Sequence, residues 1–235
     1  MLTPSSNTTL EPVTTAMLAS LPEASAHFAR FRVTEIALNK EALGQFDESE
    51  ILRAAELLAH ARVQCIGWSG TSASWLGFDA DQRLCRCITE ATGVAASTSV
   101  LALNEIFARS GVKCFGLVTP YLDDVQAAIV RNYAAAGFEC VAERHLGLRD
   151  NFSFSEVDAE RLRTMVREVA AARPDAIAIL CTHLRGAPLV AELEAELGIP
   201  IHDSVATVVW KSLQCAGADP RRVRGWGRLF DLPNP

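Results

Sequence analysis

The feature that most constrains the fold is a regular alternation of short apolar runs with longer segments of helical periodicity. The expected strands cover residues 25–33, 63–70, 94–99, 114–120, 138–146, 176–182 and 199–204. Clear helical segments cover residues 48–61, 124–137, 158–172 and 187–198. Strands that alternate with helices and are apolar along their whole length are typical of a parallel sheet covered by helices on both faces. The sequence therefore predicts an α/β fold.

Charge and apolar run length argue against two classes of function. The chain of 235 residues has a formal net charge of −6 and contains no basic cluster. Nucleic-acid binding requires a positive stripe, so we expect no nucleic-acid partner. No apolar run reaches the roughly 18 residues of a membrane span, and the N-terminus does not resemble a signal peptide. We therefore expect a cytoplasmic protein without a membrane partner.

Most of the cysteines are expected to be free thiols. The seven lie at positions 65, 85, 87, 114, 140, 181 and 215. No CxxC pair occurs, and the CRC tripeptide at 85–87 is too tight for a usual pair of zinc ligands, so we expect no metal site. Only Cys181 stands in a position that suggests chemistry.

Two segments about half the chain length apart repeat one pattern. CIGWSGTSAS at 65–74 and AILCTHLRGA at 178–187 each read as a strand, a small polar turn and the start of a helix. This spacing is expected of two duplicated lobes. Because ligands of open α/β sheets bind beyond the carboxyl ends of the strands, both turns should face one cleft.

Cys181 is the strongest candidate for chemistry. It follows an expected strand and precedes Thr182 and a helix, where backbone N–H groups and a helix N-terminus lower the pKa of a thiol. One interpretation is therefore an acid, a base or a nucleophile. The alternative is a small apolar residue that fills the end of the strand.

The turn at Gly70 is the second candidate. Glycine lets the backbone approach a ligand closely, and the hydroxyls of Thr71 and Ser72 suit the oxygens of a carboxylate or an enediolate. Serine and threonine are also usual helix N-caps. For this segment alone the cap is the simpler interpretation.

Further polar residues follow other strands. Asn7 could hold a carboxylate or cap a helix, Tyr121 could donate a hydrogen bond into the cleft or lie half-buried, and Asn151 lies in a loop between the lobes. His183 and His202 adjoin strand ends, where structural roles are the simpler interpretation. Together, strand-end polar groups with little charge indicate one small anionic substrate.

Read as a set, these motifs resemble the aspartate/glutamate racemase superfamily, in the branch of maleate cis-trans isomerase and arylmalonate decarboxylase. CTH at 181–183 is similar to the second cysteine motif of the racemases. The carboxylate-binding segments of maleate isomerase are similar to PSSNT at 4–8, TPYLDDV at 119–125 and DNF at 150–152. Arylmalonate decarboxylase is similar at GTSAS, residues 70–74, and at GWGRLFD, residues 225–231.

The resemblance implies a fold as well as a site. It implies two Rossmann-like lobes with parallel four-stranded sheets, related by a pseudo-two-fold axis, with the active site in the cleft between them. The first lobe would comprise residues 1–112 plus 206–235 and the second residues 113–205. Only three residues precede PSSNT, so we expect the first strand to be incomplete. The family uses no metal or organic cofactor, and a homo-oligomer is compatible with it.

Gly70 stands where the resemblance places the first of two cysteines in racemases and isomerases. A glycine can neither abstract a proton nor add to an alkene, so chemistry with one proton donor remains. The resemblance thus implies a cofactor-independent decarboxylase of a malonate-type dicarboxylate. Cys181 would protonate an enediolate held by Thr71, Ser72, Tyr121 and the backbone near Thr182.

Two alternatives stay open beside this lyase. The first is a maleate-type isomerase or a racemase, and the second is an inactive carboxylate-binding protein. The walls of the cleft are a separate question, because Trp68, Trp75 and Leu76 could line it or could simply pack in the core. We also expect that replacing Gly70 by cysteine would add racemase-like exchange if the two turns face each other.

Overall fold

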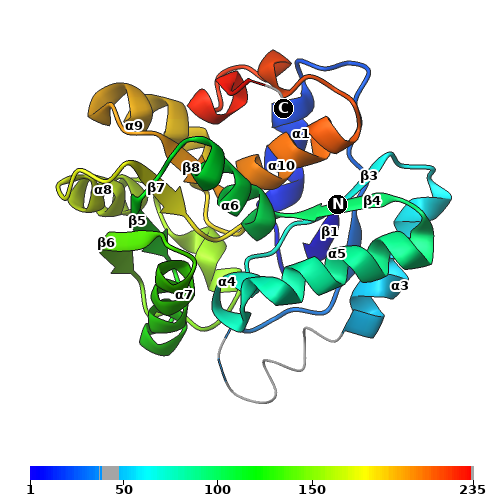
Figure 1. Cartoon of the computed structure of the whole chain (residues 1–235), viewed down its shortest axis with the longest axis horizontal. Coiled ribbons are helices and arrows are strands. Elements are labelled where there is room, and N and C mark those ends of the chain that lie inside the picture. The colour runs from blue at the N-terminus through cyan, green and yellow to red at the C-terminus, as the bar shows by residue number, and fades with distance from the viewer. Residues whose placement is uncertain (37, 39–47, 234–235) are drawn as a thin grey trace.

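The computed structural model describes residues 1–36, 38 and 48–233, and Figure 1 shows strands and helices arranged in two lobes. The strands of the first lobe are β1 (Leu2–Pro4), β2 (Ala29–Phe31), β3 (Cys65–Trp68) and β4 (Ala95–Thr98). Those of the second are β5 (Cys114–Thr119), β6 (Glu139–His145), β7 (Ala176–Ile179) and β8 (Ile201–Asp203).

Helices separate these strands along the chain. The α-helices are α1 (Leu10–Leu18), α3 (Glu48–His60), α4 (Ala73–Leu76), α5 (Phe78–Thr92), α6 (Ser99–Arg109), α7 (Asp123–Ala135), α8 (Ala159–Ala170), α9 (Val190–Leu197) and α10 (Ser204–Cys215). Short 3₁₀ helices are η1 (Phe152–Glu156), η2 (Ala187–Leu189), η3 (Pro220–Arg222) and η4 (Arg228–Asp231).

The two sheets repeat one topology. Each has four strands, in the order β2-β1-β3-β4 and β6-β5-β7-β8, and every neighbouring pair is parallel. In both sheets the strand that comes first in the chain lies beside the third, with the second and fourth strands at the edges. The predicted α/β fold of two lobes with four-stranded parallel sheets is therefore confirmed.

The strands are shorter than the apolar runs that predicted them. The run 176–182, for example, forms a strand only at Ala176–Ile179, and the run 25–33 only at Ala29–Phe31. Apolar residues past the strand ends are also buried, as Leu180 is, and the N–H of Leu180 still bonds to β5, at the carbonyl of Val118. β1 has three residues, all buried; it pairs with β2 along its length and with β3 at Leu2.

The C-terminal part of the chain returns to the first lobe. Helix α10 leaves β8 of the second sheet, yet it packs on α6, β3 and β4 of the first lobe and also contacts α1. Figure 1 shows α10, in orange, lying beside the blue α1. The lobe boundaries at residues 112/113 and 205/206 stay a prediction.

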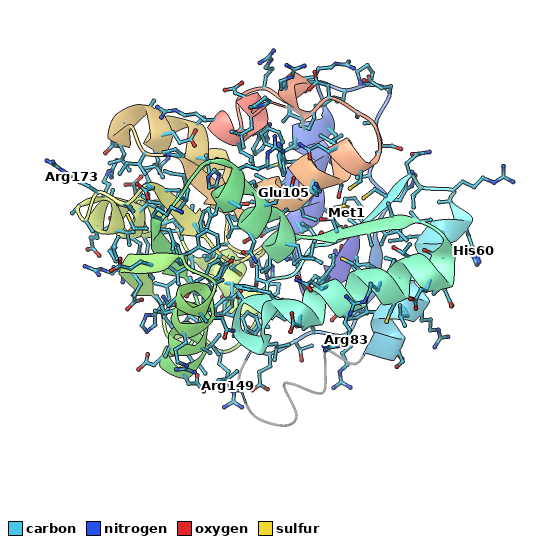
Figure 2. The ribbon with its side chains drawn as sticks, viewed as in Figure 1. Met1, His60, Arg83, Glu105, Arg149 and Arg173 are labelled. Carbon is cyan, nitrogen blue, oxygen red and sulfur yellow. The ribbon has the colours of Figure 1, made fainter. Side chains whose placement is uncertain are left out.

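The molecule is elongated along the line that joins its lobes. In Figure 2, Arg173 in the second lobe and His60 in the first lie at opposite ends of the view, and side chains fill the space between the ribbons. One apolar core runs through both lobes and a smaller one lies under α1, α10 and the C-terminal segment. None of the described helices is long and apolar enough to span a membrane.

Candidate active site

The candidate residues gather beyond the carboxyl ends of the four central strands. Asn7 follows β1, Gly70 follows β3, Tyr121 follows β5 and Cys181 follows β7. β1 and β3 flank the point at which the strand order of the first sheet reverses, and β5 and β7 flank that point in the second sheet. Ligands of open α/β sheets bind at such switch points. Because the two lobes bring their switch points together, four separate chain segments contribute to one site.

Cys181 lies in a buried loop after β7. Its side chain is only 3% exposed. The backbone N–H of His183 donates to its sulfur at 3.4 Å, the N–H of Leu184 is hydrogen-bonded to it, and the Tyr121 hydroxyl is a third partner. The next helical residues begin only at Ala187, so loop N–H groups, and not a helix N-terminus, face the sulfur.

The expected low pKa of Cys181 is wrong. Burial raises the pKa of this thiol to about 11, although the hydrogen bonds from His183 and Tyr121 oppose that rise. Removing a thiolate from water costs more than these donors return. The Asp203 carboxyl adds a smaller effect in the same direction as burial. At neutral pH the thiol is therefore protonated, which is the form that can donate a proton.

Tyr121 joins the two lobes at this site. Its hydroxyl lies 2.7 Å from the Thr71 hydroxyl and is also hydrogen-bonded to Cys181. The rings of Trp75 and Phe154 contact the tyrosine ring with centroids at 5.1 and 5.7 Å. Burial raises the pKa of Tyr121 well above its ordinary value, so its hydroxyl stays neutral. The turn at residue 70 and the thiol at 181 thus lie on one hydrogen-bonded chain, as the repeated sequence pattern predicts.

The hydroxyl groups after Gly70 do not cap the helix that follows them. Ser72 stands at the N-cap of α4 but makes no capping hydrogen bond with its side chain. The carbonyl of Thr71 accepts from the Ser74 hydroxyl at 2.6 Å, which fixes the turn. The hydroxyl of Thr71 bonds to Tyr121 instead, and both Thr71 and Ser72 are buried.

Gly70 has no space for a side chain. A Cβ atom built on it would lie 1.9 Å from the Cζ2 atom of Trp68 and 2.3 Å from its Cε2 atom. Trp68 is the last residue of β3 and is fully buried, with its ring 5.0 Å from the ring of Phe31. Leu76, by contrast, is exposed and does not pack in the core.

Asn7 both caps a helix and links the lobes. Its Oδ1 atom accepts from the N–H groups of Thr9 and Leu10, each at 2.9 Å, at the start of α1. Its Nδ2 atom donates to the Thr182 hydroxyl at 3.2 Å, and that hydroxyl donates to the carbonyl of Ser69 at 3.1 Å. The two interpretations of Asn7 are therefore compatible, since an amide has a further N–H to offer.

Asn151 lies against the segment that holds Asn7. Its Nδ2 atom donates to the Ser6 hydroxyl at 2.7 Å, and its backbone N–H donates to the carbonyl of Thr34 at 3.0 Å. It is buried, as Asn7 is. The structure thus brings both asparagines into the region between the lobes.

The two histidines have structural surroundings. The Thr8 N–H donates to the Nε2 atom of His183 at 2.9 Å, which is a contact between the lobes. Burial lowers the pKa of His183 and of His202 to about 4, so both are neutral at pH 7. Neither histidine is hydrogen-bonded to the thiol through its ring.

Asp203 is a buried carboxyl that the sequence did not single out. It ends β8, and its side chain accepts from the Val205 N–H at 2.8 Å as the N-cap of α10. Burial raises its pKa to about 7. The available signal was the Asp-Ser pair at a strand-to-helix junction, which is typical of an N-cap.

Comparisons with known proteins agree with this geometry. Residues 11–230 match the arylmalonate decarboxylase family. A maleate isomerase of Geobacillus stearothermophilus is 27% identical over 225 residues, which cover 91% of this chain and 89% of that protein. An arylmalonate decarboxylase of Bordetella bronchiseptica is 30% identical over 165 residues, or 69% of each protein.

A comparison with solved structures finds the same two groups of enzymes. The solved structure of Nocardia farcinica maleate cis-trans isomerase bound to TRIS superposes with a TM-score of 0.88 at 26% identity, over 97% of this chain and 95% of that one. The resemblance drawn from the motifs is thereby confirmed. Because the family match spans nearly the whole length, the chain belongs to the arylmalonate decarboxylase family of enzymes, in the branch that also holds the maleate isomerases.

Proposed function

We propose that this protein is a cofactor-independent decarboxylase of a small malonate-type dicarboxylate, with Cys181 as its only proton donor to carbon. The observation that carries the proposal is the asymmetry of the site. A protonated thiol lies on one side, linked through Tyr121 to Thr71, and the adjacent Gly70 has no space for a second sulfur. Such a site can deliver a proton but cannot use two opposed thiols.

The asparagines would hold the carboxylate that is retained. Asn7 and Asn151 lie on neighbouring segments and each has amide N–H groups, while Thr182 positions Asn7 by accepting one of them. These amides are neutral, so they can bind one carboxylate by hydrogen bonds. A charged side chain would instead form strong ion pairs and stabilise both carboxylates of the substrate. The second carboxylate is then free to leave.

Bond breaking leaves an electron pair that needs stabilisation. When the C–C bond to the leaving carboxylate breaks, CO2 departs and the pair delocalises into the remaining carboxylate as an enediolate. The hydroxyls of Thr71, Ser72 and Tyr121 would donate hydrogen bonds to its oxygens. Donors fixed in a dry site contribute about 3 kcal/mol each to such a step.

Protonation completes the reaction. The S–H proton of Cys181 moves to the α-carbon, the enediolate becomes a monocarboxylate, and a thiolate remains. Hydrogen bonds from His183, Leu184 and Tyr121 stabilise that thiolate until water returns a proton. Since one proton replaces one CO2, the reaction balances without a redox partner.

Maleate isomerisation is the second candidate, because several relatives that match over nine-tenths of this chain or more are named maleate isomerases. That reaction would need a thiolate that adds to the double bond. The raised pKa of Cys181 and the absence of sulfur at residue 70 both weigh against it. The remaining alternative, a binding protein without turnover, differs from both enzymes because it would neither release CO2 nor isomerise maleate.

An assay in D2O separates these functions. Malonates with different α-substituents, maleate, and amino and hydroxy diacids are incubated with the protein, and NMR follows CO2 release, fumarate and deuterium incorporation. We expect CO2 release with one deuterium at the α-carbon. Fumarate from maleate would instead establish the isomerase, and thermal stabilisation by a diacid without turnover would indicate a binding protein.

The Cys181→Ala variant tests the acid. We expect turnover to fall by about 10²–10⁴-fold, as for loss of a general acid, while diacid binding remains measurable. Cys140→Ala is the control, because Cys140 lies on the edge strand β6 of the second sheet. Unchanged turnover in Cys181→Ala removes this thiol from the mechanism.

A further inference from the structure

Trp68 fills the space that a side chain at residue 70 would need. Three atoms of its six-membered ring lie 1.9, 2.3 and 2.4 Å from the position of a Cβ atom on Gly70, well inside van der Waals contact. A real Cβ essentially never approaches another heavy atom so closely, so a side chain at residue 70 and this ring position exclude each other. The constraint is steric, because Gly70 is not among the glycines with positive φ.

The ring is held firmly in this place. Trp68 ends β3, where it pairs with Thr98 of β4 on one side and Leu2 of β1 on the other. Its ring contacts that of Phe31 from β2 at 5.0 Å. With only 1% of its surface exposed, the indole cannot rotate out without displacing its neighbours.

The side-chain position of residue 70, which the Trp68 ring fills, belongs to the site. Thr71, which follows Gly70, is hydrogen-bonded to Tyr121, and Tyr121 is hydrogen-bonded to Cys181. Residue 70 therefore lies at the first-lobe wall of a site whose thiol comes from the second lobe. A ring over the Cα atom of residue 70 closes this wall with carbon atoms.

We propose that Trp68 is the residue that determines facial selectivity. Its indole occupies the side-chain position of residue 70 and so prevents a proton donor or a water molecule from approaching the enediolate on the face away from Cys181. This proposal rests on the proposed function. It also revises the expectation for Gly70→Cys, because a thiol at residue 70 requires a smaller residue at 68.

A stability cycle tests the packing without any assay of activity. Gly70→Ala, Trp68→Leu and the double variant are compared by thermal unfolding. We expect Gly70→Ala to lower the Tm by several degrees or to prevent folding, and Trp68→Leu to remove most of that loss in the double variant. Gly67→Ala is the control beside Trp68 in β3, because a Cβ there would meet Ser212 at 2.7 Å and not Trp68.

The enantiomeric composition of the product tests the selectivity. With a substrate that gives a chiral acid, the wild type should yield one enantiomer and Gly70→Cys alone should add no exchange of the α-hydrogen. Trp68→Leu combined with Gly70→Cys should give a mixture of enantiomers and deuterium exchange into either of them in D2O.

Three results would overturn the proposal. One is exchange of the α-hydrogen in Gly70→Cys that is as fast as in Trp68→Leu combined with Gly70→Cys. Another is that Trp68→Leu restores the Tm of Gly67→Ala to the same extent as it restores that of Gly70→Ala. The third is a product of a single enantiomer from Trp68→Leu combined with Gly70→Cys. If the wild type turns over no dicarboxylate, the proposed function fails, while the stability cycle still decides whether Trp68 excludes a side chain at residue 70.

Discussion

The proposed reaction depends on the protonation state of Cys181. Burial holds the pKa of the thiol at about 11, so the acid form dominates through neutral pH and is lost only as pH rises through that value. We expect the rate of decarboxylation to stay flat up to about pH 10 and to fall only as the pH approaches 11. A nucleophilic thiolate predicts the opposite, a rate that rises about tenfold per pH unit. Initial rates between pH 6 and 10 distinguish the two.

Removal of the Tyr121 hydroxyl is the second informative change at a single residue. Tyr121→Phe breaks the link between Thr71 and Cys181 and removes one donor to the enediolate. We expect kcat to fall by about 10²–10³-fold with a small change in KM. The other tyrosine of the chain gives a matched control, since the buried hydroxyl of Tyr133 has no hydrogen-bond partner among the described residues. An equal loss in Tyr133→Phe would show that the effect is structural.

Individual site residues could be found from the sequence, but their chemical state could not. Cys181, Tyr121 and Asn7 stand in motifs directly after strands, so their neighbourhood follows from the topology. The pKa of the thiol depends on how far the loop is covered by the opposite lobe, which no local pattern records. The same holds for Gly70, because the ring that covers it comes from a residue two positions earlier whose rotamer depends on Phe31.

At the scale of elements, helix α1 and the site share one amide. Asn7→Ala removes both the cap of α1 and the donor to Thr182, while Asn7→Asp keeps an oxygen for the N–H groups of Thr9 and Leu10. We expect Asn7→Ala to lower the free energy of unfolding by about 1–2 kcal/mol. Asn7→Asp should lose much less stability but should bind diacids far more weakly, because it presents a carboxylate.

Urea denaturation and calorimetric titration with succinate measure the two effects of these variants separately. If Asn7→Asp binds succinate as well as the wild type does, Asn7 is only a cap. The two variants can be compared in this way because the Oδ1 atom of Asn7 caps α1, whereas its Nδ2 atom donates at the site.

The elements themselves were predictable in kind and order. Alternating apolar runs and helical segments gave the parallel α/β class because doubly covered strands are apolar throughout. Strand ends were not predictable, since Leu180 and Cys181 are as buried as the paired residues before them. A strand of three residues such as β1 has no measurable periodicity, although it lies at the centre of its sheet.

For the whole molecule, Asp203 makes stability depend on pH. Its pKa is raised from 3.8 to about 7 by burial, so the folded state holds a proton that the unfolded state has lost between these values. The free energy of unfolding contributed by this group therefore falls as pH rises from about 4 to about 7. Relative to Asp203→Asn, the wild type should be less stable at pH 8 than at pH 5, by a few kcal/mol at most.

Urea denaturation at these two pH values checks the sign. Asp158→Asn is the matched control, because Asp158 caps α8 through the Arg161 N–H but is exposed. A difference between wild type and Asp203→Asn that does not change with pH would mean that Asp203 is ionised in the folded protein.

The burial of the site has a kinetic consequence. Thr71, Tyr121 and Cys181 are each less than a tenth exposed, so a dicarboxylate can meet the thiol only after the protein has opened transiently. Opening and product escape, and not the breaking of the C–C bond, would then limit turnover. Carbon-13 in the departing carboxylate would in that case leave the steady-state rate almost unchanged, while a more viscous solvent would slow it.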